Sequence, residues 1–397
     1  MIPRLVLFLI LGIDSSILLF QTSELSISYY EASILYGEFS VLQYLIKTSL
    51  YFFGHNDFAL RLPMIILHLL SVVILYKISK LYIKLQRNRL WLTFIFVLLP
   101  GIISSALIID NTGLLLFGLF FFVYIYQKNL KLFLYPLLFI YLLVDTGFLF
   151  LFLALSLFSI KEKDKNFFIF NIILFFTSLY LYGVDAHGTP QGHLIDSIGI
   201  YATIFTPIIF IYIFYILYRK YLNKDTEILW YISSTALIVS LFLSFRQRIY
   251  LEHFAPYLML ALPIMAQVFE HSYRVRLKMF RNKYRIIFII TISFLLINSS
   301  FVFFNKYLYL VVDNPKKHFA YKMHVAKELA SKLNDMGINC IHSDIKMSNR
   351  LKFYNIGNCN SYILIENNLD YLNEKTVTIS YKNRLVYQAT VTKLNIN

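Results

Sequence analysis

The chain has 397 residues, of which 58% are hydrophobic and 15% charged, and its mean hydropathy is +0.63. Soluble globular proteins carry about 25% charged residues, so this composition excludes an ordinary soluble domain and indicates a membrane protein with many spans. The formal net charge of +15 falls mainly in short loops between apolar segments, where it reports topology, and we therefore expect no nucleic-acid partner.

Apolar runs long enough to cross or nearly cross a bilayer recur along most of the chain. The run at 132–144 and the one at 147–160 are short, and together they are also compatible with a re-entrant segment. The first run has no small-residue cleavage site, so it predicts a span and not a signal peptide. The eleven runs lie at 4–22, 60–83, 90–109, 112–127, 132–144, 147–160, 166–183, 200–218, 228–245, 256–270 and 286–304.

Basic residues are distributed unequally between the two sets of connecting loops. One set contains nineteen lysines and arginines, whereas the other contains four, namely Lys47, Arg61, Arg246 and Arg248. The basic side of a membrane protein faces the cytoplasm. The sequence therefore predicts that the first loop at 23–60, Asp110 and the C-terminus lie on the opposite face, which in a bacterium is the periplasmic side of the inner membrane.

The composition changes after Phe304, which predicts a membrane domain at 1–304 and a small soluble α/β domain at 305–397. A stripe of apolar residues predicts an amphipathic helix from His318 to Met336, and Gly337 is typical of a helix C-terminus. Alternation of apolar and polar residues predicts strands in the rest of the domain. The expected strands are Ile338–His342, Tyr362–Ile365 and a hairpin of Val377–Tyr381 with Leu385–Val391 that turns at Lys382–Arg384.

Both cysteines, Cys340 and Cys359, fall in the C-terminal domain. An oxidising compartment permits a disulfide, and the ends of neighbouring strands could bring the two residues together. We nevertheless expect two buried free thiols in preference to a bridge.

The segment from Ile27 to Pro63 is too long to be a simple connection between packed helices. It has apolar residues at helical spacing, which predicts two short helices in the plane of the membrane interface with a turn at Gly54–Asn56. It also carries Glu31, Glu38, Asp57 and Arg61 between apolar spans. Charged groups in such positions are expensive, so they are candidates for function.

Two carboxylates stand out as candidate catalytic groups. Glu31 lies in an apolar and aromatic stretch, which suits a general base, although it could also be a solvated glutamate of the loop. Asp110 lies at a tight turn between two spans. It could instead be a helix N-cap, because Asp110, Asn111 and Thr112 are all capping residue types, and that role does not exclude a place in the site.

Cations on the same expected face are candidates for binding a phosphate. Arg61 lies at the start of the second span, where the alternative is an anchor that reaches lipid phosphates. Arg246 and Arg248 form a basic pair that could hold a phosphate or diphosphate, and the alternative is contact with lipid headgroups.

A histidine-containing loop follows the span at 166–183. It contains Asp185, His187, His193 and Asp196, which could ligate a divalent ion. Metal ligands are usually held at tighter spacing on regular elements, so the sequence favours a polar loop. We assign no metal ligands and leave the requirement for a divalent metal open.

Several segments resemble glycosyltransferase family 39. The clearest is YFFGHNDFALRLPMIILHLLSVVILYKISKLY, similar to the signature of the family's second span. LLPGIISSALIIDNTGLLLF resembles the family's next luminal turn, with Asp110 at the acidic position. ISYYEASILY resembles the first-loop Ser–Tyr–Asp–Glu–Ala motif, and HFAPYLMLALP the late Arg–Tyr–x–x–Pro–x–x–Pro segment. The resemblance covers about residues 1–304.

The resemblance implies an α-helical polytopic membrane protein with the C-type glycosyltransferase fold of protein O-mannosyltransferases and lipid A aminoarabinose transferases, plus a small extracytoplasmic domain. It implies inverting transfer of a sugar from a polyprenyl-phosphate carrier to a lipid, glycan or protein acceptor. Glu31 would be the base and Asp110 the second carboxylate. Arg61, Arg246, Arg248 and His253 would contact phosphate.

The chain also departs from the family pattern. The family's first-loop Asp aligns with Tyr30, which we place among the substrate-binding residues, and the late Arg aligns with His253. The Pro–Pro that ends the family's loop aligns with Ser40–Val41. The alternative function is a non-catalytic protein that binds lipid-linked glycans, or a transporter. Transporters tend to have paired repeats, and the sequence shows no internal repeat.

Overall fold

A computed structural model describes residues 2–183, 192–366 and 375–393. The chain divides into two compact units, one made of Met1–Ser15 with Met64–Ser299 and the other of Ser16–Pro63 with Ser300–Asn397. Helices α1 (Ile2–Glu24), α4 (Asp57–Tyr82) and α16 (Lys278–Phe303) each contribute residues to both units. This division groups the first loop with the C-terminal residues, whereas the sequence boundary at 304 remains a prediction.

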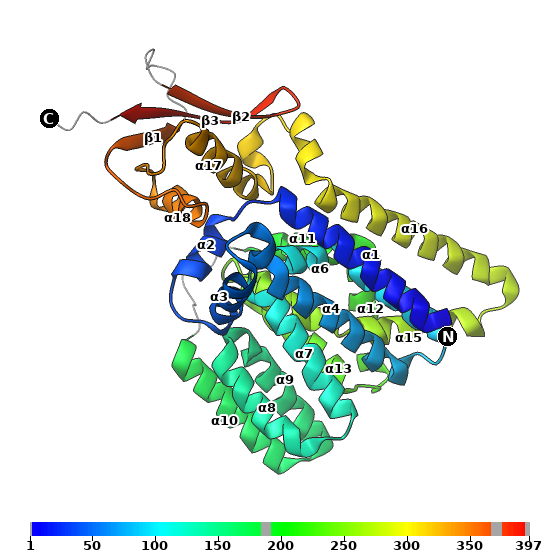
Figure 1. The fold of residues 1–397 in the computed structure, drawn as a ribbon. Coiled ribbons are helices and arrows are strands. Elements are labelled where there is room, and N and C mark those ends of the chain that lie inside the picture. Colours follow the sequence, from blue (N-terminus) through cyan, green and yellow to red (C-terminus); the bar gives the residue numbers. More distant parts are fainter. Residues whose placement is uncertain (1, 184–191, 367–374, 394–397) are drawn as a thin grey trace. The chain divides into compact units, whose positions relative to one another are not determined.

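The first unit is helical, and the apolar runs of the sequence form its helices. Each of the eleven runs forms a helix or an interrupted pair of helices. Figure 1 shows these helices in chain order. Besides its parts of α1, α4 and α16, the unit contains α5 (Gln86–Val97), α6 (Pro100–Leu107), α7 (Asn111–Gln127), α8 (Lys131–Val144), η1 (Thr146–Phe148), α9 (Leu149–Glu162), α10 (Lys165–Tyr182), α11 (Leu194–Phe205), α12 (Pro207–Leu222), α13 (Ile228–Ser244), η2 (Leu251–His253), α14 (Ala255–Met259) and α15 (Leu262–Val275).

The lengths of these helices differ from the eleven spans that we expected. Within the described residues, four single helices are long and apolar enough to cross a membrane: Pro3–Glu24, Asp57–Tyr82, Lys165–Tyr182 and Lys278–Phe303. Two further pairs, α5 with α6 and α11 with α12, are bent by 62° and 108°. Proline begins the second helix of each pair, and the residue before a proline is disfavoured in helical conformation, which explains the breaks.

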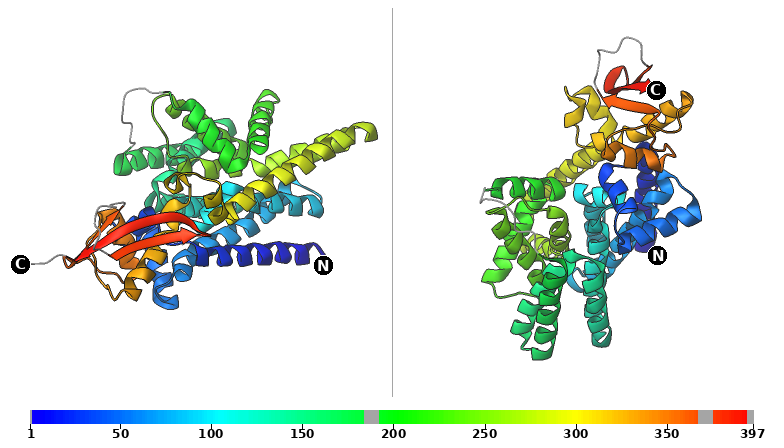
Figure 2. Two further views of the ribbon diagram at one scale, coloured as in Figure 1. Left: turned by 90° about the horizontal axis from the view of Figure 1, so that it is seen from above. Right: turned by 90° about the vertical axis from the view of Figure 1, so that its left-hand side faces the viewer.

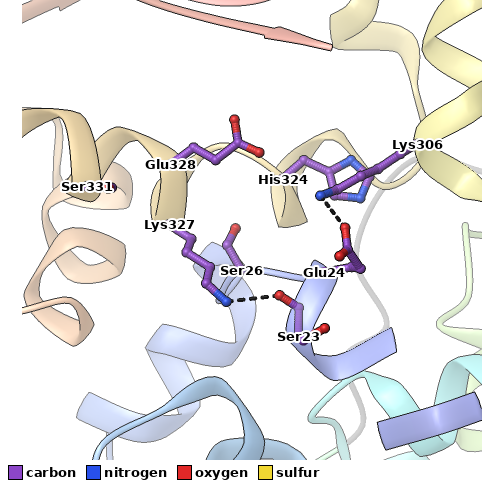
Figure 3. A pocket seen from close by; sticks show the side chains of 8 residues that line it. All are labelled: Ser23, Glu24, Ser26, Lys306, His324, Lys327, Glu328 and Ser331. Carbon is purple, nitrogen blue, oxygen red and sulfur yellow. Dashed lines mark hydrogen bonds and ion pairs between the residues drawn. The ribbon is translucent and has the colours of Figure 1, made fainter. Parts of the chain in front are cut away.

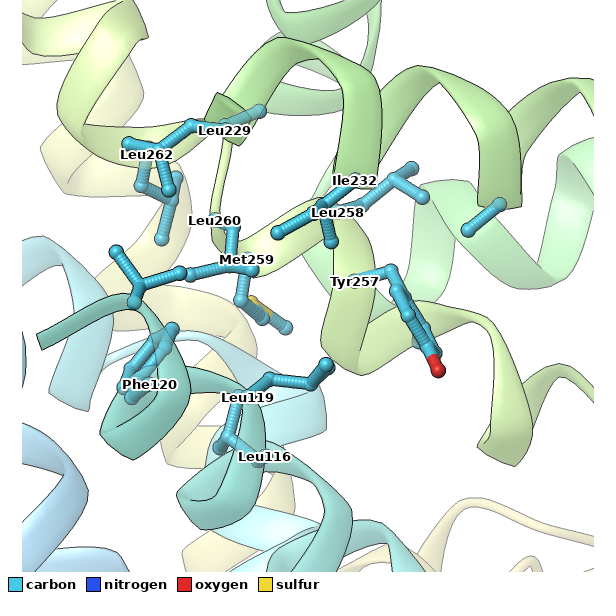
Figure 4. Close-up of a cluster of buried hydrophobic side chains, with 14 of the residues drawn as sticks. Leu116, Leu119, Phe120, Leu229, Ile232, Tyr257, Leu258, Met259, Leu260 and Leu262 are labelled. Carbon is cyan, nitrogen blue, oxygen red and sulfur yellow. The ribbon is translucent and has the colours of Figure 1, made fainter. Parts of the chain in front are cut away.

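The interior of the first unit is closely packed around α7, α13 and α14. Leu116, Leu119 and Phe120 on α7 lie near side chains of the segment 257–262 (Figure 4). Leu229 and Ile232 on α13 belong to the same buried cluster. Such a core holds the connections between helices in fixed positions, and Asp110 and Asp145 lie on two of these connections.

A buried pair of polar side chains lies within the apolar helices themselves. The Nε2 atom of His68 on α4 is 2.7 Å from Oδ2 of Asp14 on α1, and both side chains are buried. A polar group buried among apolar residues is costly unless it is paired, and each of these two supplies the other's partner. The pair therefore links α1 to α4 inside the first unit.

The second unit contains the two short helices that the first loop was expected to form. They are α2 (Tyr29–Tyr36) and α3 (Val41–Phe53), so this prediction is confirmed, while their orientation in a membrane remains a prediction. Gly54 has φ of +82°, a conformation that favours glycine. The turn at Gly54–Asn56 therefore separates α3 from α4 and does not join the two short helices to each other.

The C-terminal part of this unit is a small α/β structure. Its three-stranded antiparallel sheet has the order β1–β3–β2, and α17 contacts β2 (Figure 1). Figure 2 shows the curved pair of β2 and β3 from two further directions. Its elements are η3 (Asn305–Leu310), η4 (Pro315–Lys317), η5 (Tyr321–Met323), α17 (Ala326–Asp335), α18 (Ile345–Phe353), β1 (Tyr362–Glu366), β2 (Lys375–Tyr381) and β3 (Arg384–Lys393).

The expected hairpin is confirmed, with a turn at Lys382 and Asn383, both of which have positive φ. Two other expectations for this part are wrong. The residues 338–342 make only isolated bridges, Cys340 with Gly357 and His342 with Ile363, and do not form a strand. The helix expected from His318 begins at Ala326, because the residues before it form 3₁₀ turns and Phe319 is exposed.

Cys340 and Cys359 form a disulfide. The expectation of two free thiols is therefore wrong. The bridge between Cys340 and Gly357 places the backbone of the two segments side by side, which brings the cysteines within bonding distance.

Candidate active site

Glu31 is fixed at the start of α2 by a capping box. The backbone N–H of Ser28 donates to Oε2 of Glu31 over 2.7 Å, and the N–H of Glu31 donates to Oγ of Ser28 over 3.2 Å. The Ser–x–x–Glu spacing produces this arrangement, because it satisfies two N–H groups that the first turn of a helix leaves free. The Glu31 side chain is fully buried, so the solvated alternative is wrong.

Arg61 lies against Glu31 and is also completely buried. Its Nη2 atom is 3.3 Å from Oε2 of Glu31 and donates to the carbonyl of Ser26 over 2.9 Å. Its Nη1 atom lies 3.8 Å from Oδ1 of Asp57, one helical turn earlier on α4. No part of this guanidinium reaches the surface, which excludes the anchor to lipid phosphates and leaves a buried cation between two carboxylates.

Asp57 connects this cluster to the C-terminal residues of the same unit. Tyr354, which follows α18, donates its hydroxyl hydrogen to Oδ1 of Asp57 over 2.7 Å, and Nζ of Lys327 lies 2.9 Å from Oδ2. Burial, and next the charge of Asp57, raises the pKa of the Tyr354 hydroxyl. Tyr354 is therefore protonated and able to donate.

The backbone just before α2 is held by the same C-terminal residues. The N–H of Ile27 donates to the Tyr354 hydroxyl over 3.0 Å, and Nε of Arg350 donates to the carbonyl of Ile27 over 3.0 Å. The N–H of Ser26 donates to the carbonyl of Met323 over 2.7 Å. These three bonds fix the backbone segment just before the Ser28–Glu31 capping box.

Asp110 caps the N-terminus of α7, as the alternative interpretation predicted. Its Oδ1 atom accepts a hydrogen bond from the N–H of Thr112 over 2.9 Å, and the residue is partly exposed. The next residue, Asn111, donates from Nδ2 to Oδ2 of Asp145 over 2.5 Å. The residue next to Asp110 is thus bonded to a second carboxylate, which the sequence did not single out.

Asp145 is buried in the connection between α8 and η1. Its Oδ1 atom accepts the N–H of Gly147 over 2.7 Å. A Cβ atom at Gly147 would lie 2.7 Å from that oxygen and 3.2 Å from Nδ1 of His253, so the three residues meet closely. The hydroxyl of Tyr257 donates to the Gly147 carbonyl over 2.6 Å. The structure therefore places His253, a predicted site residue, next to an unpredicted carboxylate.

Arg246 and Arg248 lie in the turn after α13, and both are exposed. Tyr30, on α2, is also exposed, with 55% of its surface accessible. The two arginines differ from Arg61 in this respect, because an exposed guanidinium can meet an anion without first losing a protein partner.

Metal ligation has no clear candidate. In the ranges that the structure describes, no group of three or more His, Cys, Asp or Glu residues could hold a metal ion. His193 Nδ1 lies 3.4 Å from Oδ2 of Asp196, whereas Asp185 and His187 fall outside the described residues. No step below is therefore assigned to a metal.

The predicted site residues fall into two groups. Glu31, Tyr30 and Arg61 belong to the unit with the C-terminal residues. The other unit holds Asp110, Arg246, Arg248 and His253. A cavity shared by Glu31 and Asp110 remains a prediction.

The sequence did not point to four residues of these clusters, namely Lys327, Arg350, Tyr354 and Asp145. Tyr354 and Asp57 are 297 positions apart in the chain, and no local pattern links them. Asp145 carried a weak signal, because it is a lone carboxylate in the apolar stretch LLVDTGFLF.

Comparisons with known proteins identify the fold. No protein-family model matches the sequence, and no curated protein matches it. The chain is similar in structure to ArnT from Cupriavidus metallidurans, whose crystal structure was determined in the apo state. The TM-score is 0.59 at 10% sequence identity, and the match covers 97% of each chain. The protein thus shares the fold of ArnT, built from apolar helices with a small C-terminal sheet.

Proposed function

We propose that the chain is a membrane glycosyltransferase that moves a sugar from a polyprenyl-phosphate carrier to a lipid, glycan or protein acceptor. The fold shared with ArnT over 97% of the chain carries this proposal. The clusters around Glu31 and Asp145 agree with it, because each places a carboxylate beside a cationic or histidine side chain.

The reaction requires two kinds of group. A carboxylate takes the proton of the acceptor hydroxyl while the acceptor oxygen bonds to the anomeric carbon. The bond from that carbon to the phosphate oxygen breaks with inversion, and the electron pair leaves on the lipid phosphate. Positive charge then stabilises the developing phosphate anion.

The burial of the residues decides how the roles are distributed. Arg246 and Arg248 are exposed and suit the phosphate, and His253 lies in the same unit. Arg61 is engaged by Glu31 and Asp57, so its proposed part is to orient the Glu31 carboxylate. Glu31 is fully buried, so it can take a proton from an acceptor only after a change of conformation that exposes its carboxylate.

The carboxylates are compared in one experiment. A deletion strain is complemented with the wild-type gene and with Glu31→Gln, Asp110→Asn or Asp145→Asn, and its lipids and glycans are profiled. Loss of a general base lowers a rate by about 10²- to 10⁴-fold, so the variant of the true base should leave the deletion profile unchanged. Equal expression and membrane insertion of the variants is the control.

The complete burial of Glu31 favours one alternative, a non-catalytic protein that binds lipid-linked glycans. If all three carboxamide variants restore the wild-type profile, the transferase proposal fails and this alternative takes its place. A deletion strain with an unaltered glycan and lipid profile would have the same meaning.

We also propose that the protein lies in a bacterial inner membrane with its C-terminal domain in the periplasm. The asymmetry of nineteen against four basic residues supports this orientation. A reporter that is active only in the periplasm should give a signal when it is fused after Asn397. A signal only from a reporter that is active in the cytoplasm would contradict the proposed topology.

A further inference from the structure

A pocket of about 270 Å³ lies in the unit that contains the C-terminal residues (Figure 3). The end of α1 forms one part of its wall, and the residues around α17 form the other. Neither the candidate catalytic carboxylates nor the exposed arginines line it. Its ionisable lining residues are Glu24, Lys306, His324, Lys327 and Glu328.

Two buried polar atoms of the pocket residues have no hydrogen-bond partner among the described residues. They are Oγ of Ser26 and Nε2 of His324. The two residues are 1% and 5% exposed, respectively. The other ring nitrogen of His324 bonds to the hydroxyl of Tyr309 over 2.9 Å. A buried polar group without a partner destabilises the folded protein, so both atoms point to a ligand that supplies hydrogen bonds.

The residues that line the pocket carry both signs of charge. Lys306 Nζ lies 2.6 Å from Oε2 of Glu24, and Lys327 donates to the carbonyl of Ser23 over 2.9 Å (Figure 3). Lys327 also pairs with Asp57, which does not line the pocket. An ammonium group has three N–H donors, so Lys306 retains capacity for an anionic oxygen. Glu328, on the exposed side of α17, presents a carboxylate to the same space (Figure 3).

His324 adds no charge to this lining. Burial first, and then the charge of Lys306, lowers its pKa to about 3, so the ring is neutral. The ionisable lining therefore consists of two cations and two anions. A simple anion would be attracted by the lysines and repelled by the glutamates, whereas a ligand with both signs of charge can satisfy both.

Two of the pocket residues lie at or near the ends of candidate membrane-spanning segments. Glu24 is the last residue of the candidate span Pro3–Glu24, and Lys306 follows the end of the candidate span Lys278–Phe303 by three residues. Residues at such positions lie at the level of lipid headgroups. A volume of about 270 Å³ is at the small end for ligand pockets, which suits a headgroup.

We propose that this pocket binds the headgroup of a zwitterionic phospholipid, a phosphate ester that carries a primary amine. The phosphate oxygens accept hydrogen bonds from Lys306, Lys327 and Ser26, and the ammonium group lies at Glu328. The inference does not depend on the transfer reaction proposed above.

Lipid retention tests the proposal. The full-length protein is purified from vesicles that contain equal amounts of phosphatidylethanolamine and phosphatidylglycerol, and the bound lipids are counted by native mass spectrometry. We expect the wild type to retain phosphatidylethanolamine preferentially. Glu328→Gln should reduce this preference about tenfold, equivalent to about 1.4 kcal/mol. Asp335→Asn, which alters an exposed carboxylate on the same helix outside the pocket, should retain it.

Soluble compounds then distinguish the source and the charge of the ligand. Glycerophosphoethanolamine should displace the retained lipid, and inorganic phosphate should do so far less well. Equal retention of the two lipids by the wild type, or an unchanged preference in Glu328→Gln, would overturn the proposal. Equal competition by inorganic phosphate would overturn the assignment of an amine, and binding of glycerophosphoethanolamine without displacement of lipid would overturn the lipid source.

Discussion

The Nη2 atom of Arg61 lies 3.3 Å from Oε2 of Glu31, and neither side chain has any exposed surface. Two opposite charges that are removed from water together depend on each other, because each compensates the loss of solvation of the other. The same guanidinium is 3.8 Å from Asp57, which in turn accepts a hydrogen bond from Tyr354. The candidate base is therefore part of a buried network whose other end is in the C-terminal residues.

Replacement of Arg61 by methionine should destabilise the protein strongly. It leaves Glu31 and Asp57 buried without their shared cation, and the loss of one partner of a buried pair costs about 3–5 kcal/mol. The thermal unfolding of the full-length protein in detergent measures this. Lys47→Met, at an exposed position on α3, is the control. Combining Arg61→Met with Glu31→Gln should recover part of the loss, and a melting temperature of Arg61→Met equal to that of the wild type would contradict the prediction.

Removal of the Tyr354 hydroxyl should loosen the chain before α2. In Tyr354→Phe the N–H of Ile27 loses its acceptor and Asp57 loses a donor, at a cost of about 1–3 kcal/mol. Hydrogen exchange should therefore become faster in peptides that cover residues 25–31. Tyr51→Phe, which alters an exposed tyrosine of the same unit, should leave exchange there unchanged. An unaltered exchange rate in Tyr354→Phe would show that the hydroxyl does not hold this segment.

The disulfide between Cys340 and Cys359 predicts that denatured, unreduced protein contains no free thiol. Labelling with a thiol reagent before and after reduction tests this. A sequence separation of 19 residues predicts that replacing both cysteines by serine lowers the free energy of unfolding by about 3 kcal/mol. Two labelled thiols per chain in the unreduced sample would rule out the bridge.

Acidification should destabilise the region around His324. Burial lowers the folded-state pKa of this residue to about 3 from its ordinary value of 6.5. The unfolded chain therefore binds a proton between pH 6.5 and pH 3 that the folded chain does not. In that window the free energy of unfolding decreases by about 1.4 kcal/mol for each unit by which the pH is lowered. Above pH 6.5 this contribution is constant.

Thermal unfolding of full-length protein across this pH range measures the effect. His324→Gln should unfold with a smaller dependence on pH than the wild type, because the titrating group is gone. His271→Gln, at an exposed position on α15, is the control and should retain the wild-type slope. If the melting temperature of His324→Gln depends on pH as steeply as that of the wild type, His324 does not cause the acid sensitivity.

Local features of the chain could be predicted from the sequence because local interactions determine them. Each apolar run became helical, since a buried or membrane-exposed helix satisfies its own backbone hydrogen bonds. The hairpin around Lys382 and the αL conformation of Gly337 follow from turn and cap preferences within a few residues. The errors at the start of α17 and at 338–342 also arose where tertiary contacts override a short pattern.

The site was predicted less completely. Glu31, Arg61 and Asp110 were recognisable as charged groups near apolar segments, and the cap role of Asp110 was foreseen as an alternative. The complete burial of Arg61 was not predicted, because a guanidinium at the start of a span can face either lipid or protein. Asp145 was missed because a single carboxylate carries no motif, and its importance appears only with Asn111 and His253 beside it.

The sequence by itself determined the class of protein, the positions of its apolar segments and the capping of α2 and α7. Each of these depends on composition or on residues less than about one helical turn apart. Only the tertiary structure decided that Tyr354 meets Asp57, that Arg350 holds the carbonyl of Ile27, and that Cys340 meets Cys359. Such contacts join distant segments through packing and burial, and many sequences with the same local pattern could place those segments differently.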